Sequence, residues 1–67
     1  MADIGKMTRN YLVARDGAIK REGAAMSRLS NRTGYGVEML RSIAYGRKTP
    51  DMGNECARKL REAVRRG

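Results

Sequence analysis

The pair of glycines in Gly34-Tyr35-Gly36 is the feature that most constrains how this chain folds. Apolar residues recur at helical spacing on both sides of it: Ala25, Met26 and Leu29 before it, and Val37, Leu40, Ile43 and Ala44 after it. Two glycines within three residues disfavour a continuous helix and supply the backbone freedom, including positive φ, that a sharp corner requires. The sequence therefore predicts a helix over 24–32, a short turn, and a second helix over 36–45.

The second of these helices has a clear end. Gly46 follows Tyr45 and provides the usual left-handed exit from a helix, and a basic run closed by the only proline, Arg47-Lys48-Thr49-Pro50, comes next. Two apolar-faced helices joined by a tight turn form the pattern of a helix-turn-helix.

The segment from Met26 to Lys48, MSRLSNRTGYGVEMLRSIAYGRK, resembles the helix-turn-helix of small phage regulators, the Cro and lambda-type repressor family. The stretch Pro50-Asp51-Met52-Gly53 and the later ARKLRE, residues 57–62, resemble the helix that follows in that family. Two positions depart from the pattern: Gly36 stands where the family usually has Ser or Thr, and Thr33 where it often has an apolar residue. The resemblance implies a compact all-α, lambda-repressor-like domain of four to five helices. It also implies that helix 24–32 lies across the DNA backbone while helix 36–45 enters the groove.

The remaining elements are predicted from caps and periodicity. We expect a flexible arm over residues 1–7 and a single domain over 8–67, with Thr8 as the N-cap of the first helix. Gly17 marks either a bend or a break in that helix. The last helix is expected to begin near Asp51 and to run to about Arg65. Its inner stripe comprises Cys56, Ala57, Leu60, Ala63 and Val64.

Length and charge bound the function. A chain of 67 residues forms one small domain that buries only roughly 60% of its unfolded surface, so we expect a homodimer to add stability. With 15 Lys and Arg against 7 Asp and Glu, the net charge is +8, which indicates a polyanionic partner such as nucleic acid. Membrane surfaces are anionic too, but no apolar run approaches the roughly 20 residues of a membrane span, and the N-terminus does not read as a signal peptide. We therefore expect a cytoplasmic protein, in a bacterium or a phage-infected host, with no membrane partner.

Metal and enzymatic chemistry find no support in the composition. A single cysteine, Cys56, excludes an internal disulfide, and the lack of histidine excludes the usual zinc sites. We expect the Cys56 thiol to be buried, with an exposed redox thiol as the alternative. No nucleophile with a plausible base and no phosphate-binding glycine loop is present. We expect no catalytic residues, no cofactor, no metal and no small-molecule substrate.

Helix 36–45 carries the residues predicted to read DNA bases. Leu40 and Ile43 must point into the core, which leaves the other face to a major groove whose width suits a helix. Arg41 is the first choice, because a guanidinium can bond guanine O6 and N7 together. The predicted base-reading set is Val37 for a thymine methyl group, Glu38 for a cytosine amino group, Arg41 for guanine, and Ser42 as donor or acceptor. The alternative is a solvated face with a weak ion pair between Arg41 and Glu38.

Residues on either side of this helix are predicted to contact phosphates. The set comprises Ser27, Arg28, Asn31, Arg32, Tyr35, Tyr45, Arg47, Lys48 and Thr49. The two tyrosines could instead cover the edge of the core, and the basic loop could simply keep the protein in solution.

These observations lead to one main hypothesis and one alternative. The main hypothesis is a sequence-specific, double-stranded DNA-binding transcriptional regulator, a phage or phage-derived repressor that binds a palindromic operator as a homodimer. The alternative is a protein-interaction module, namely an antitoxin, a phage inhibitor or an RNA-binding adaptor, that uses the same basic helices.

Overall fold

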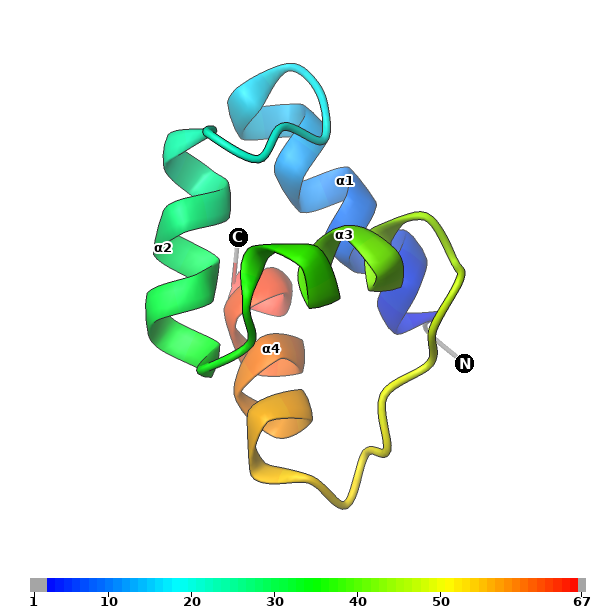
Figure 1. Ribbon diagram of the computed structural model, residues 1–67. Coiled ribbons are helices and arrows are strands. Elements are labelled where there is room, and N and C mark those ends of the chain that lie inside the picture. The colour runs from blue at the N-terminus through cyan, green and yellow to red at the C-terminus, as the bar shows by residue number, and fades with distance from the viewer. Residues whose placement is uncertain (1–2, 67) are drawn as a thin grey trace.

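The computed structural model describes residues 3–66, which form four α helices and no strand (Figure 1). The helices are α1 (Ile4–Asp16), α2 (Ala24–Thr33), α3 (Val37–Ala44) and α4 (Glu55–Arg66). The prediction of an all-α domain of four to five helices is confirmed, with four helices in residues 3–66. Residues 1 and 2 of the expected arm and residue 67 at the end of the expected domain lie outside the described part.

The first helix begins earlier than the sequence indicated. Asp3 is its N-cap, and the Asp3 carboxylate accepts a hydrogen bond from the backbone N–H of Gly5 at 2.9 Å. Thr8 is a buried residue inside the helix, where its hydroxyl donates to the carbonyl oxygen of Ile4 at 2.7 Å. The expected arm is therefore wrong for residues 4–7, and Thr8 is not a cap. The glycine inside the first turn has a packing reason, since a Cβ on Gly5 would lie 2.7 Å from the Ile43 carbonyl oxygen.

The end of α1 also holds the start of α2. Gly17 adopts a left-handed conformation with φ of 82°, so of the two possibilities at Gly17 the break is the correct one. The preceding Asp16 turns its carboxylate to the N-terminus of α2, where it accepts from the N–H groups of Ala25 at 3.0 Å and Met26 at 3.2 Å. The N-cap of α2 is Gly23, which has no side chain, and a Cβ there would overlap the Asp16 carboxylate. Asp16 thus supplies the missing cap from nine residues away.

The connection between α2 and α3 is a three-residue turn fixed by hydroxyl groups. Gly34 has φ of 83°, a conformation that favours glycine. The buried Thr33 hydroxyl donates to the carbonyl oxygen of Leu29 at 2.7 Å and accepts from the N–H of Tyr35 at 3.1 Å. The Ser30 hydroxyl donates to the carbonyl oxygen of Tyr35 at 2.7 Å. A threonine at position 33 therefore satisfies backbone groups that an apolar residue would leave to solvent.

The core lies between the helices, and α3 packs on α1 and α2 while α4 packs on α1 and α2 from the other side. The largest fully buried apolar side chains are Leu12, Met26, Leu29, Leu40, Ile43 and Leu60. In the view of Figure 1, α3 lies in front and α4 behind it. The first and last residues of α2 and of α3 lie within one residue of the expected bounds, 24–32 and 36–45. None of the four described helices has the length and apolar composition needed to cross a membrane.

The last helix begins four residues after the expected start. Asp51 does not cap it, because the Asp51 carboxylate accepts from the N–H of Gly53 at 2.9 Å in the preceding loop. The cap is supplied by Asn54, whose side-chain oxygen accepts from the N–H of Cys56 at 2.7 Å. The expected inner stripe is otherwise correct, with Ala57, Leu60, Ala63 and Val64 buried. Cys56 itself is only half-buried, so the expectation of a buried thiol is met in part.

Candidate nucleic-acid interface

The outer face of α3 carries the candidate site. Leu40, Ile43 and Ala44 are buried on the inner side of this eight-residue helix. Glu38 is exposed on the other side, and Arg41 and Ser42 are half-buried there. Three of the four predicted base-reading residues therefore share one surface. The fourth, Val37, is half-buried and packs against the core, which differs from its expected outward position.

Glu38 is held between two arginines. One oxygen of its carboxylate lies 2.7 Å from Nε of Arg21, and the other accepts from Nη1 of Arg41 at 3.0 Å. Arg21 comes from the loop between α1 and α2, so no spacing within α3 could have indicated this contact. The Arg21 and Glu38 side chains are 64% and 65% exposed, and ion pairs in such positions contribute at most about 1 kcal/mol each. Glu38 thus fixes the direction of Arg41 more than it stabilises the fold.

Arg41 keeps a donor without a partner. Its side chain is 28% exposed, and its Nε is buried with no hydrogen-bond acceptor among residues 3–66. A buried donor left unpaired costs on the order of 1–3 kcal/mol. A rotation of the Arg41 side chain that brought Nε to a hydrogen-bond acceptor on a bound molecule would therefore be favourable. The Arg41 side chain is thus partly accessible to solvent, and not all of its hydrogen-bond donors have partners among residues 3–66.

Tyr45 links α3 to the basic loop. Its ring is 49% exposed and lies 5.9 Å from the guanidinium carbon of Arg41 and 5.4 Å from that of Arg47. Such cation–π contacts contribute about 0.5–1 kcal/mol at exposed sites. The N–H groups of Arg47 and Lys48 both donate to the carbonyl oxygen of Ser42, at 2.8 and 3.3 Å. These bonds fix the exposed basic loop against the end of α3.

The structure places two further basic residues, which the sequence did not indicate as contacts, beside the end of α3. Lys6 and Arg9 are exposed on α1 and, together with Asp3, Tyr45 and Gly46, line a hollow of about 130 Å³. They had no place among the contacts predicted from the sequence, because residues 1–7 were expected to form a flexible arm and Asp3 opposes the charges of Lys6 and Arg9. Asp3, two residues before a helical Gly5, was the available signal that a helix begins there.

The predicted phosphate contacts do not all lie together. On α2, the side chains of Ser27, Arg28, Asn31 and Arg32 are all exposed. Arg32 lines a hollow of about 300 Å³ with Lys59, Glu62 and Ala63 of α4, so it belongs to the α4 side of the molecule. Thr49 is exposed in the loop that carries Arg47 and Lys48.

Tyr35 is half-buried in the turn and packs against the core. Burial, together with the charges of Cys56 and Asp51, raises the pKa of the Tyr35 phenol above its ordinary value. The alternative that Tyr35 covers the edge of the core therefore describes its position best.

No group of three or more His, Cys, Asp or Glu side chains in residues 3–66 is placed to hold a metal ion. The described side chains on the α3 face are hydrogen-bond donors and acceptors suited to phosphates and base edges.

Comparison of the chain with protein-family models, curated proteins and solved structures gives no match. The case for a function therefore comes from the geometry of the α3 face and from the charge of the chain.

Proposed function

We propose that this chain is a sequence-specific, double-stranded DNA-binding transcriptional regulator in which α2 and α3 act as a helix-turn-helix and α3 enters the major groove. One observation carries the proposal. The helix α3 buries Leu40 and Ile43 and turns its other face to solvent beside an exposed basic loop. On that face the Arg41 side chain is partly exposed, while its buried Nε has no acceptor among residues 3–66. An α helix fits the major groove, and arginine to guanine is the commonest specific contact there.

The residues of this face take different parts in the proposal. Arg41 reads guanine through its guanidinium. Glu38 holds Arg41 in the free protein and, once Arg41 turns to a base, remains anchored by Arg21 with one oxygen available to a cytosine amino group. Ser42 and the exposed part of Val37 add smaller contacts. Glu38 is thus a positioning residue first and a base reader second.

Phosphate contacts surround this face. The basic loop supplies Arg47, Lys48 and Thr49, Tyr45 supplies a hydroxyl, and Lys6 and Arg9 join them from the start of α1. The exposed Ser27, Arg28 and Asn31 of α2 lie on the helix that would cross the backbone. Arg32 is left out, because it lies beside α4. A net charge of +8 supplies the sequence-independent part of the affinity.

A small phage-type repressor similar to the Cro and lambda-type family is the form of regulator we propose. Such a protein binds a palindromic operator as a homodimer and blocks transcription by occupying the promoter. Two-fold symmetry places the two α3 helices in major grooves one helical turn apart, about 34–36 Å.

Selection from a randomised duplex library tests the proposal. We expect enrichment of palindromic sequences whose half-site centres lie about 10–10.5 base pairs apart. Salt titration on an enriched duplex and on a scrambled duplex then separates the specific from the charge-driven part of binding. Binding without any enriched sequence would contradict a regulator, and equal or tighter binding to structured RNA would favour the adaptor alternative.

A further inference from the structure

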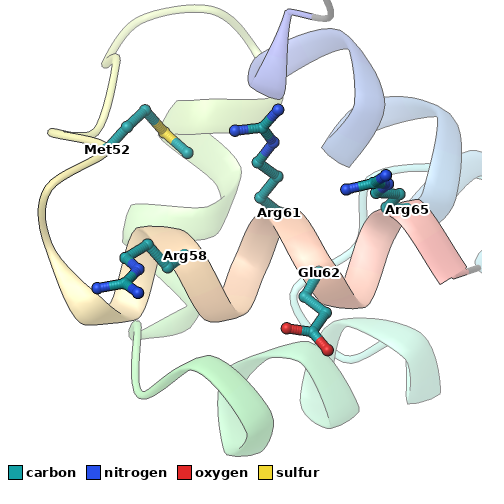
Figure 2. A pocket seen from close by; sticks show the side chains of 5 residues that line it. All are labelled: Met52, Arg58, Arg61, Glu62 and Arg65. Carbon is teal, nitrogen blue, oxygen red and sulfur yellow. The ribbon is translucent and has the colours of Figure 1, made fainter.

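A second basic surface lies on α4, and the proposed function does not use it. Arg58, Arg61 and Arg65 line a hollow of about 620 Å³ together with Met52 and Glu62 (Figure 2). The spacing of three and four residues places the three arginines along one side of the helix over roughly 10 Å. All three are exposed, and within residues 3–66 none of them forms an ion pair or a hydrogen bond through its guanidinium.

This arginine surface, residues 58, 61 and 65 with Met52, faces away from α3. The helix α4 packs mainly on α1 and α2, and none of its described Cα atoms lies within 8 Å of a Cα atom in α3. In Figure 1, α3 lies in front of α4, whereas in Figure 2 α4 lies in front. A duplex bound along α3 would therefore leave the arginine surface open to a second molecule.

The hollow combines cations with an apolar side chain. Met52 is 37% exposed, and in Figure 2 the side chains of Met52 and Arg61 extend toward one another across the hollow. Glu62 points to the other side of α4, where it also lines the hollow shared with Arg32 and Lys59. Methionine adapts its shape to different apolar partners. The surface thus suits a ligand that carries an apolar side chain among carboxylates.

We propose that the arginine surface of α4 binds an acidic, amphipathic segment of a partner protein. Acidic residues three and four apart on a partner helix would meet Arg58, Arg61 and Arg65 in register, with an apolar residue against Met52. The phosphates of a DNA duplex could meet the three arginines, but a duplex offers no apolar side chain to Met52.

A second copy of this chain is a poor occupant of the same surface. Residues 55–65 carry Arg58, Lys59, Arg61 and Arg65 against Glu55 and Glu62, a net charge of +2 (four positive minus two negative). Two such faces repel one another.

Fluorescence anisotropy with a labelled synthetic peptide tests this proposal without any DNA. The probe is a helical peptide with Glu at three- and four-residue spacing and Leu between them. We expect the native chain to bind it and R61Q/R65Q to bind it roughly tenfold more weakly, since the variant lacks two of the three cations that would pair with the carboxylates of the peptide. The charge-matched control K20Q/R28Q, altered on α2 and the loop before it, is expected to lose no more than about twofold.

Three results would overturn the proposal. The first is no binding of the peptide, and the second is an equal loss in both double variants, which would mean that net charge alone acts. The third is displacement of the peptide by a single-stranded oligonucleotide of equal charge at the same or a lower concentration, which would assign the surface to nucleic acid. A peptide with Ser in place of Leu is expected to bind several-fold more weakly because the contact with Met52 is lost. Since no step involves duplex DNA, these results are independent of the proposed role of α3.

Discussion

Removal of the Asp16 carboxylate is predicted to destabilise the whole domain, although Asp16 lies at the surface end of α1. The carboxylate is the acceptor for two N–H groups in the first turn of α2, those of Ala25 and Met26. Loss of a capping side chain costs about 0.5–2 kcal/mol, and a negative charge at a helix N-terminus adds about 0.3–1 kcal/mol. We expect Asp16→Ala to lower the free energy of unfolding by about 2 kcal/mol. For a domain of this size that corresponds to a fall in Tm of roughly 8–16 °C.

Gly23→Ala provides a second route to the same loss. Gly23 has φ of −67° and ψ of 145°, an extended conformation that alanine also adopts freely, so the backbone conformation itself would not be strained by the substitution. The added Cβ would instead overlap the Asp16 carboxylate, which must swing away and release both N–H groups. We expect Gly23→Ala to cost about as much as Asp16→Ala, and the double variant to cost little more than either one.

Thermal and urea unfolding followed by far-UV circular dichroism measures these changes. Glu22→Ala is the matched control, because Glu22 is an exposed acid in the same loop, and its removal is expected to change stability by less than about 0.5 kcal/mol. Additive losses in the Asp16/Gly23 double variant would refute the reasoning, since they would mean that the two residues act through separate contacts.

Three further predictions follow from other contacts. Gly5→Ala places a Cβ 2.7 Å from the Ile43 carbonyl oxygen and is expected to lower the free energy of unfolding in urea by about 1–3 kcal/mol. Gly36→Ala has nothing within 4 Å of the new Cβ and only replaces the N-cap of α3 by a poorer one, so it is expected to cost less than about 1 kcal/mol. Equal effects would contradict a close approach of α1 and α3. The raised pKa of Tyr35 means that the folded chain keeps the phenol proton to a higher pH than the unfolded chain does, so the free energy of unfolding is expected to fall as pH rises above about 10. Tyr35→Phe is expected to remove this part of the dependence of stability on pH. An unchanged dependence in the variant would exclude burial of Tyr35 as its cause. Arg47→Ala and Lys48→Ala are each expected to weaken binding to enriched and scrambled duplexes alike. Each is also expected to lower the magnitude of the slope of log K against log salt concentration by about 0.9, and an unchanged slope would exclude that residue as a phosphate contact.

The glycine turn explains why α2 and α3 could be placed from the sequence. Apolar spacing marks the buried sides of these two helices, and Gly34 and Gly46 adopt the positive φ values that end them, 83° and 77°. Local chemistry is sufficient here, because each signal lies within a few residues of the boundary that it sets.

Contacts between distant segments explain what the sequence did not indicate. Residues 1–7 were expected to form a flexible arm, yet Gly5 lies inside α1, where the approach of the Ile43 carbonyl group requires a glycine. Asp51 looked like a helix cap, but it bonds to Gly53 in the loop, and Asn54 caps α4 instead. At the candidate site, Arg21 reaches Glu38 from 17 residues away. Pairings of this kind depend on how the helices pack, which periodicity alone does not specify.

The role of Arg41 is the central claim, and a ratio of dissociation constants tests it most directly. The ratio compares an enriched duplex with a scrambled duplex at fixed salt, for the native chain, for Arg41→Ala and for Arg58→Ala as a control of equal charge on α4. We expect Arg41→Ala to lower the preference for the enriched duplex by about 1–3 kcal/mol, or roughly 5- to 150-fold, and Arg58→Ala to leave it unchanged. An equal loss of affinity for both duplexes on replacing Arg41 would contradict the account.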